Sequence, residues 1–254
     1  MSQDYSKLVS FLGIILKIIP LSLFEKLIKA LLYGRLRANP STEGLKTALK
    51  LDNTLYGICG QLAVSYDNGN HAKQRLTGYI DNFAHLATKM DGPYLDIGCG
   101  SGVLSHAIAQ KTQQTVTGID IIESKVKSAS KRYKQNNLDF IVGDATQMAL
   151  NQQYQTIILS NVLEHISERV SFLKALNNYH NPEQFLIRVP IFERDWRVPL
   201  KKELNIDWRL DSTHETEHTI REFKEEITKS GLRIHRSEVK WGEIWAVVKP
   251  KNES

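Results

Sequence analysis

The chain has 254 residues but only two cysteines, Cys59 and Cys99. Cys99 stands inside a glycine-rich stretch, and no closely spaced cysteine pair offers a zinc-type cluster. This scarcity argues against a secreted scaffold that depends on disulfides. A reducing compartment, the cytoplasm, is the location we expect for such a chain.

Long hydrophobic runs are also absent. The most apolar stretch, residues 8–16, is followed by Lys17 and Pro20 before it reaches the ~20 residues that span a bilayer. A signal peptide would need a small-residue cleavage site after this stretch, and no convincing one follows. The sequence therefore predicts neither a membrane-spanning helix nor a secretory signal.

Net positive charge is scarce beyond the first 40 residues. That segment holds six basic and two acidic residues, and thus four of the five net positive charges of the chain. The remainder is almost neutral and lacks the basic stripe that contacts phosphates, so no nucleic-acid partner is expected.

Residues 1–40 are predicted to form a basic amphipathic helical arm. Ser22 and Glu25 fit a capping box, and Gly34 is expected to end the helix that follows. The arm could lie on an anionic membrane surface, where each basic residue adds ~1 kcal/mol, or pack on the domain or in a homodimer. Residues 41–90 are predicted to form a helical lid, or a helical segment that leads into the main domain. Residues 91–254 are predicted to form that main domain.

Residues 94–102 read Tyr-Leu-Asp-Ile-Gly-Cys-Gly-Ser-Gly and are the most informative stretch of the chain. An apolar run reaches Asp96, three glycines follow at alternate positions, and a helical segment begins at Val103. The glycines are Gly98, Gly100 and Gly102. Such a turn lets a cofactor lie directly against the backbone. Dinucleotide-binding turns would need glycine in place of Val103, so a nicotinamide-dependent oxidoreductase is disfavoured.

The spacing Asp-x-Gly-x-Gly-x-Gly resembles motif I of class I S-adenosylmethionine-dependent methyltransferases, including their type 11 superfamily. The resemblance implies that Asp96 and the glycine turn, Cys99 included, hold the methionine part of S-adenosylmethionine. A glycine-rich turn without any ligand is the alternative.

From Tyr94 onward, short apolar strands alternate with helical segments. The strands are expected at 94–97, 115–119, 139–142, 156–160 and 184–189, with a C-terminal hairpin around residues 241–242. This alternation indicates a parallel sheet covered on both faces. With the resemblance, it predicts an α/β, Rossmann-like fold: a seven-stranded, mostly parallel sheet, a C-terminal antiparallel hairpin strand and an N-terminal helical extension.

Polar residues stand where these strands end, at the edge where such sheets bind ligands. Asp120 follows Gly98 by 22 residues, a spacing that suits a carboxylate binding ribose hydroxyls. Asp144 and Ala145 follow the next strand and are expected to contact adenine. The cofactor-binding set is completed by Ile121 and Asn161. Each aspartate alone could equally be a helix cap.

Methyl transfer to a hydroxyl needs an aligned acceptor and a base, while the cofactor supplies the electrophile. His165, after the fourth strand, and His214 are the candidate bases. A few methyltransferases bind a divalent ion through Glu-x-x-Glu-His and a later histidine. Here Asn161 replaces the first glutamate and Glu164 the second, so no metal is expected.

The link after the fifth strand, residues 190–218, is long, and long loops in compact domains are usually functional. It is rich in arginine, tryptophan and acidic residues, which suits acceptor recognition. The expected acceptor pocket comprises Glu164, Arg194, Trp196 and His218. The pattern His214-x-x-Glu217-His218 occurs in one metalloprotease class, but it needs a helix displaying both histidines and a third ligand.

The sequence thus predicts a methyltransferase that uses S-adenosylmethionine. The expected acceptor is a small molecule, a glycan or a lipid-linked compound, with oxygen as the favoured methylated atom. The alternative is a non-catalytic binding module of the same fold, tethered to a membrane or a partner by the N-terminal arm.

Overall fold

The computed structural model describes residues 12–13, 16–38, 40–67, 71–147, 150 and 152–251. These residues fall into two compact units. The first contains the described residues up to Ile58 and the segment Leu204–Ile206, and the second contains the rest. The three-part division at residues 40 and 90 stays a prediction, and residues 1–11 of the arm lie outside the described residues.

Helix α2 (Leu21–Arg37) corrects two details of the predicted arm. It starts directly after Pro20 with no side-chain cap, so the capping box at Ser22 is wrong. It also continues through Gly34. The fixed φ of proline suits the start of a helix, and a single interior glycine costs only ~1 kcal/mol.

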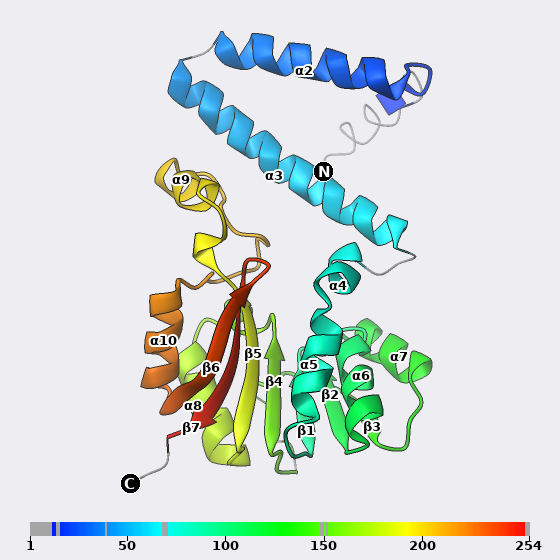
Figure 1. Ribbon diagram of the computed structural model, residues 1–254, viewed down its shortest axis with the longest axis vertical. Helices are drawn as coiled ribbons and strands as arrows, with labels where there is room; N and C mark the ends of the chain where they lie inside the picture. The colour runs from blue at the N-terminus through cyan, green and yellow to red at the C-terminus, as the bar shows by residue number, and fades with distance from the viewer. Residues whose placement is uncertain are drawn as a thin grey trace. The chain divides into compact units, whose positions relative to one another are not determined.

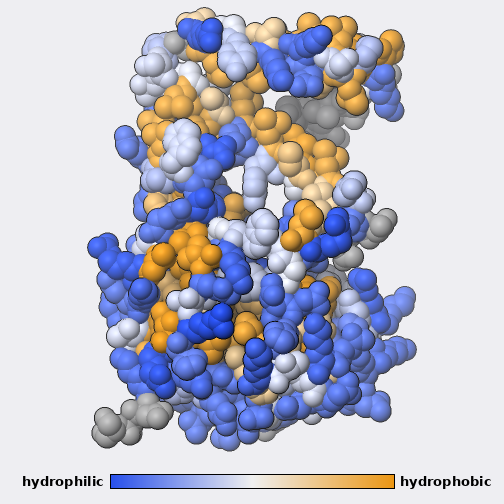
Figure 2. All heavy atoms as spheres, viewed as in Figure 1, coloured by the Kyte–Doolittle hydropathy of each residue, from blue (hydrophilic) through white to orange (hydrophobic). Residues whose placement is uncertain are grey.

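Helix α3 (Ser41–Tyr66) begins in the first unit, where it lies close to α2. A Cβ atom at Gly44 would lie 2.7 Å from the carbonyl oxygen of Leu36, so this contact requires glycine. Helix α2 has no buried residue, and most of its large apolar side chains are exposed (Figure 2). Among the described residues, no helix is both long and apolar enough to cross a membrane. Membrane contact and protein packing by the arm both stay predictions.

The second unit is built on one seven-stranded sheet (Figure 1). Its strands are β1 (Tyr94–Ile97), β2 (Val116–Asp120), β3 (Leu138–Val142), β4 (Thr156–Ser160), β5 (Gln184–Pro190), β6 (Leu232–Lys240) and β7 (Glu243–Pro250). They lie in the order β3-β2-β1-β4-β5-β7-β6, and β7 alone in this sheet is antiparallel to both of its neighbours. The predicted Rossmann-like fold is confirmed.

Helices cover both faces of the sheet (Figure 1). On one face lie α5 (Tyr79–Ala87), preceded by α4 (Ala72–Thr77), and α6 (Val103–Thr112), with α7 (Glu123–Arg132) beside them. On the other face lie α8 (Arg169–His180) and α10 (Ile220–Lys229). The short helices η1 (Leu163–His165), η2 (Phe192–Arg194) and α9 (Arg197–Glu203) belong to the loops after β4 and β5.

The order of the strands reverses between β1 and β4, because the chain moves outward from β1 to β3 and then returns to the other side. Ligands of such sheets bind at this reversal, beyond the carboxyl ends of the strands. The glycine turn follows β1, and η1 follows β4. The fold therefore brings the predicted cofactor turn and the predicted base His165 to one place.

Candidate active site

The three glycines of the turn share a backbone conformation that favours glycine, but they differ in what surrounds them. All three glycines have positive φ, at 69° for Gly98, 57° for Gly100 and 76° for Gly102. A Cβ atom would lie 2.6 Å from Val162 at Gly98 and 2.5 Å from Phe140 at Gly102. At Gly100 it would meet nothing within 4 Å. The outer glycines therefore serve close packing, whereas Gly100 leaves the backbone open for a ligand.

Asp96 lies inside β1 with its carboxyl group buried, and the Ser105 hydroxyl donates to it at 2.6 Å. Burial raises the pKa of Asp96 to about 7, the negative charge of Asp120 adds to the rise, and the Ser105 hydrogen bond opposes it. A cationic ligand group beside Asp96 would restore its charged form.

Asp120 is the last residue of β2, and its carboxylate stabilises the glycine turn through hydrogen bonds to the backbone. One oxygen accepts from the backbone N–H of Gly100 at 2.8 Å, and the other from that of Ile122 at 2.8 Å. Burial raises the pKa of the neighbouring Cys99 thiol, while Ile121 is exposed. Asp120 is therefore held at the sheet edge, beside the turn.

Asp144 and Ala145 lie in the loop after β3. The Asp144 carboxylate accepts from the backbone N–H of Thr146 at 2.9 Å and from its hydroxyl at 2.7 Å. Asp144 thus shapes its own turn, and its predicted contact with adenine stays a prediction.

The segment after β4 carries a buried carboxyl group. Asn161 adopts a positive φ of 57° and donates its side-chain amide to one oxygen of Glu164 at 2.9 Å. Glu164 is fully buried, and its other oxygen has no partner among the described residues. Burial raises the pKa of this carboxyl group, although Asn161 and the nearby histidines oppose the rise.

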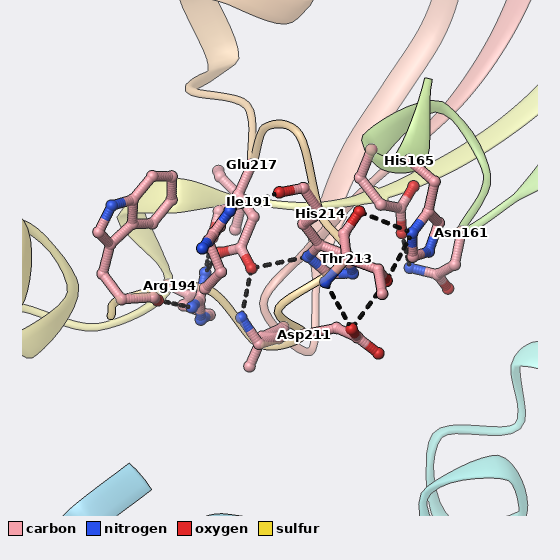
Figure 3. Close-up of polar contacts among 12 residues, drawn as sticks. Asn161, His165, Ile191, Arg194, Asp211, Thr213, His214 and Glu217 are labelled. Carbon is pink, nitrogen blue, oxygen red and sulfur yellow. Dashed lines mark hydrogen bonds and ion pairs between the residues drawn. The ribbon is translucent and has the colours of Figure 1, made fainter. Parts of the chain in front are cut away.

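The loop after β5 returns to this segment and brings His214 beside His165 (Figure 3). The backbone N–H of Glu215 donates to the Glu164 carbonyl at 2.7 Å, and the two imidazole rings lie edge to face at 4.8 Å. One ligand atom from each of Glu164, His165 and His214 lies within 4.8 Å of the others. We refer to these three residues as the Glu-His-His cluster.

Hydrogen bonds at Nδ1 orient both histidines of this cluster. His214 Nδ1 lies 2.9 Å from a Glu217 carboxylate oxygen, which can only accept, so Nδ1 carries the proton. His165 Nδ1 lies 3.1 Å from the Thr213 hydroxyl, whose proton goes to Asp211 at 2.8 Å. Each ring is therefore left with a lone pair on Nε2, available to a proton or a cation.

Glu217 is held by Arg194, one of the residues expected to bind the acceptor (Figure 3). The Arg194 guanidinium pairs with Glu217 and also donates to the carbonyls of Ile191 at 3.1 Å and Trp208 at 2.8 Å. Arg194 therefore braces the loop that positions His214. Its contact with the acceptor stays a prediction.

Two other residues, His218 and Trp196, were predicted to line the acceptor pocket. His218 is buried, with Nε2 3.0 Å from a Glu226 oxygen on α10. Its predicted place in the acceptor pocket stays a prediction. Trp196 is 70% exposed, and its predicted role remains untested. Residues 214–218 are not helical, so the arrangement required by the metalloprotease pattern is absent from this described segment.

Three positioning residues were not predicted from the sequence: Ser105, Thr213 and Glu217. Ser105 follows the glycine turn by less than one helical turn, a position that could have suggested it. Asp211-Ser-Thr213 has the spacing of a side-chain-capped turn, which the structure forms. Nothing local marks Glu217 as the partner of His214.

A family described as "Methyltransferase domain" matches residues 88–234 of this chain. The chain belongs to this methyltransferase-domain family. The match covers the glycine turn, the Glu-His-His cluster and the loop between β5 and α10. The predicted resemblance is confirmed at the level of the family, whose members depend on S-adenosylmethionine.

Relatives of this methyltransferase-domain chain differ in what they act on. A ubiquinone biosynthesis O-methyltransferase of Nitrosospira multiformis is 33% identical over 109 residues, which cover 41% of this chain and 44% of the relative. A ribosomal protein L11 methyltransferase of Thermotoga maritima is 24% identical and covers 58% of this chain and 54% of the relative. The chain thus spans about half the length of these curated relatives.

Solved structures confirm the fold. Magnesium protoporphyrin IX methyltransferase from Synechocystis, crystallised with S-adenosylhomocysteine, superposes with a TM-score of 0.56 at 18% identity. The match covers 71% of this chain and 84% of that one. An identity this low supports the fold alone.

Proposed function

We propose that the chain binds S-adenosylmethionine at the glycine turn and transfers its methyl group to a hydroxyl group of a small-molecule acceptor. The observation that carries this proposal is the contact between the two halves of the site. Gly98 of the turn packs directly on Val162, within the segment that leads to the Glu-His-His cluster. A cofactor on the turn therefore lies beside two imidazoles with free Nε2 atoms.

Each half of the site has a separate task. The cofactor supplies an electrophilic methyl group on a positively charged sulfur. Asp96 and Asp120 bind and orient it, with Asp96 beside its amino-acid end and Asp120 beside its ribose. His214 Nε2, held in place by Glu217, removes the proton of the acceptor hydroxyl as the methyl group is transferred. The loop formed by residues 190–218 holds the acceptor and excludes water.

The ubiquinone relatives favour oxygen as the methylated atom, since they are named O-methyltransferases. The oriented His214–Glu217 pair agrees with this, because a hydroxyl must lose a proton whereas a thioether or tertiary amine need not. Phenolic compounds are therefore the first acceptors to assay.

A second candidate differs in how the proton is removed. The unpartnered oxygen of Glu164 and the Nε2 atoms of His165 and His214 could instead hold a divalent ion that lowers the pKa of the acceptor hydroxyl. Asn161 takes the place of a further carboxylate ligand, which weakens this candidate.

The proposal is tested first by cofactor binding and then by transfer. S-adenosylhomocysteine is expected to raise the melting temperature of the chain, and Asp96→Ala or Asp120→Ala is expected to remove that increase. Labelled S-adenosylmethionine should then methylate at least one member of a phenol panel. No stabilisation at millimolar ligand would refute the cofactor site, and binding without transfer to any acceptor would favour a non-catalytic module.

A further inference from the structure

Helix α2 of the first unit carries a stripe of exposed leucines. Leu23, Leu27 and Leu31 recur at intervals of four residues and are 48%, 46% and 66% exposed. Because an α-helix turns by ~100° per residue, this spacing places the three side chains on one side of α2. Contiguous apolar side chains in water are unfavourable, and such patches mark sites of interaction. We refer to these three residues as the leucine stripe.

The leucine stripe is distinct from the side of α2 that packs on α3. Phe24, Leu32 and Leu36 are half-buried. Leu36 is also the residue whose carbonyl oxygen lies against Gly44 of α3, so this half-buried side is the one that meets α3. Leu31 directly precedes Leu32, which turns the stripe away from that side by ~100°. The contact between α2 and α3 therefore leaves the leucine stripe open to another partner.

Basic side chains border the leucine stripe along its other edge. Lys26 directly precedes Leu27, and Arg37 follows Lys26 by about three turns of the helix, so the two exposed cations lie along the same edge. Helix α2 contains four basic residues and a single acidic one, Glu25, which pairs with Lys29 at 2.6 Å. Four positive charges less one negative charge leave +3. The partner is therefore expected to be apolar beneath the stripe and negatively charged at its edge.

An anionic lipid surface has both properties. Tyr33 is 63% exposed, and the Arg37 guanidinium lies 5.3 Å from the centroid of its ring. Tyrosine rings and long basic side chains lie at the level of the lipid headgroups when a helix rests in a membrane surface. A second copy of the chain fits less well, because pairing through the same stripe would bring two basic edges together, and like charges across an interface are costly.

We propose that α2 docks the chain on an anionic lipid bilayer. The leucine stripe enters the boundary between headgroups and acyl chains, and Lys26 and Arg37 lie at the anionic headgroups. An amphipathic helix that binds in this way lies in the plane of the interface, with its apolar face buried by ~5–10 Å. This inference goes beyond the proposed function and does not depend on it, since it concerns where the chain is held and not the reaction.

Flotation of the full chain with lipid vesicles tests the proposal. The chain is expected to bind vesicles of phosphatidylcholine mixed with phosphatidylglycerol about 10- to 100-fold more tightly than vesicles of phosphatidylcholine alone. Binding to the mixed vesicles should weaken at high salt, because dissolved ions screen the charges. No binding to the mixed vesicles at low salt, or equal binding to both kinds of vesicle, would overturn the proposal.

Two double variants assign the binding to α2. Leu27→Gln with Leu31→Gln is expected to weaken binding to the mixed vesicles about 10- to 100-fold, because less apolar surface leaves water. Lys26→Gln with Arg37→Gln should weaken it about 10- to 30-fold, since each basic residue near an anionic surface contributes about a factor of five. Unweakened binding by both double variants would assign the contact to another part of the chain and overturn the proposal.

The matched controls lie in the second unit. Leu76 of α4 is 66% exposed, as Leu31 is, and Lys131 of α7 is an exposed lysine on a helix. Leu76→Gln and Lys131→Gln should bind the mixed vesicles like the unaltered chain. Because all the substituted side chains are exposed, we expect every variant to keep its melting temperature and the increase caused by S-adenosylhomocysteine. A failure to dock is thereby distinguished from a failure of the cofactor site.

Hydrogen exchange in the unaltered chain locates the contact directly. The backbone amides of residues 21–37 are expected to exchange more slowly when the mixed vesicles are present, because opening of the helix is then suppressed. Unchanged exchange in these residues would overturn the proposal. Sedimentation equilibrium without lipid examines the other occupant: a dimer that Leu27→Gln with Leu31→Gln dissociates would assign the leucine stripe to a second copy and likewise overturn it.

Discussion

The two halves of the candidate site are built in different ways. The cofactor half comes from one short stretch, β1, the glycine turn and the start of α6, with Asp120 from the next strand. The acceptor half comes from two loops, in which His165 and Thr213 meet although they lie 48 residues apart in the chain. The first is fixed by local backbone geometry, whereas the second depends on a long loop held in place by Arg194 and Glu217. Changes in the two halves should therefore have separable effects, on binding in one and on the transfer step in the other.

The largest expected effect separates the transfer step from cofactor binding. With an acceptor identified by the phenol panel, His214→Asn is expected to lower kcat by about 10²- to 10⁴-fold, because the proposed general base is removed. Glu217→Gln should lower kcat less, since it keeps the shape of the side chain but loses the charge that orients His214. Steady-state kinetics measures both. The affinity for S-adenosylhomocysteine should not change, and a parallel loss of that affinity would contradict the division of the site.

The glycine turn itself offers a matched pair of variants. Gly102→Ala is expected to lower the free energy of unfolding by ~2–4 kcal/mol, because its Cβ would clash with Phe140 at a positive φ. Gly100→Ala has space for its Cβ and should cost only ~1–2 kcal/mol, from its positive φ. Its methyl group would nevertheless occupy the space left for the ligand. Urea unfolding with calorimetry distinguishes them, and normal cofactor binding by Gly100→Ala would show that the ligand lies elsewhere.

The strands and the glycine turn could be predicted from the sequence because both depend on local patterns. Alternating apolar segments placed every strand of the parallel core to within a residue or two, and the glycine spacing identified the cofactor class. The acceptor half could not be predicted in the same way. His214 and His218 belong to one short pattern, yet the first lies against His165 and the second is buried against Glu226. Only the path of the loop decides between them.

The affinity for S-adenosylhomocysteine is expected to depend on pH through the ionisation of Asp96. Because the pKa of Asp96 is raised to about 7, a proton must leave before the carboxylate can bind the amino group of the cofactor. The affinity for S-adenosylhomocysteine should therefore be constant above pH ~7.5 and fall towards about tenfold per pH unit below pH ~6.5. Calorimetry across this range measures it. Asp96→Asn should bind more weakly with no such slope, and an unchanged slope in this variant would assign the titration to another group.

Metal removal is expected to have the smallest effect. If His214 acts as the base, dialysis against a chelator should leave the rate of methyl transfer unchanged, because the proton is taken by imidazole and not by an ion-bound oxygen. The rate is measured before and after dialysis. A loss that Mg²⁺, Mn²⁺ or Zn²⁺ restores would establish the Glu-His-His cluster as a metal site and replace the proposed base.

The most direct test of the account is a crystal structure of the chain with S-adenosylhomocysteine. We expect the ligand to lie on the glycine turn, with its ribose at Asp120 and its sulfur facing the Glu-His-His cluster across the space where the acceptor binds. A ligand bound away from the turn, or one whose sulfur faces away from His165 and His214, would contradict the central claim that the two halves form one methyl-transfer site.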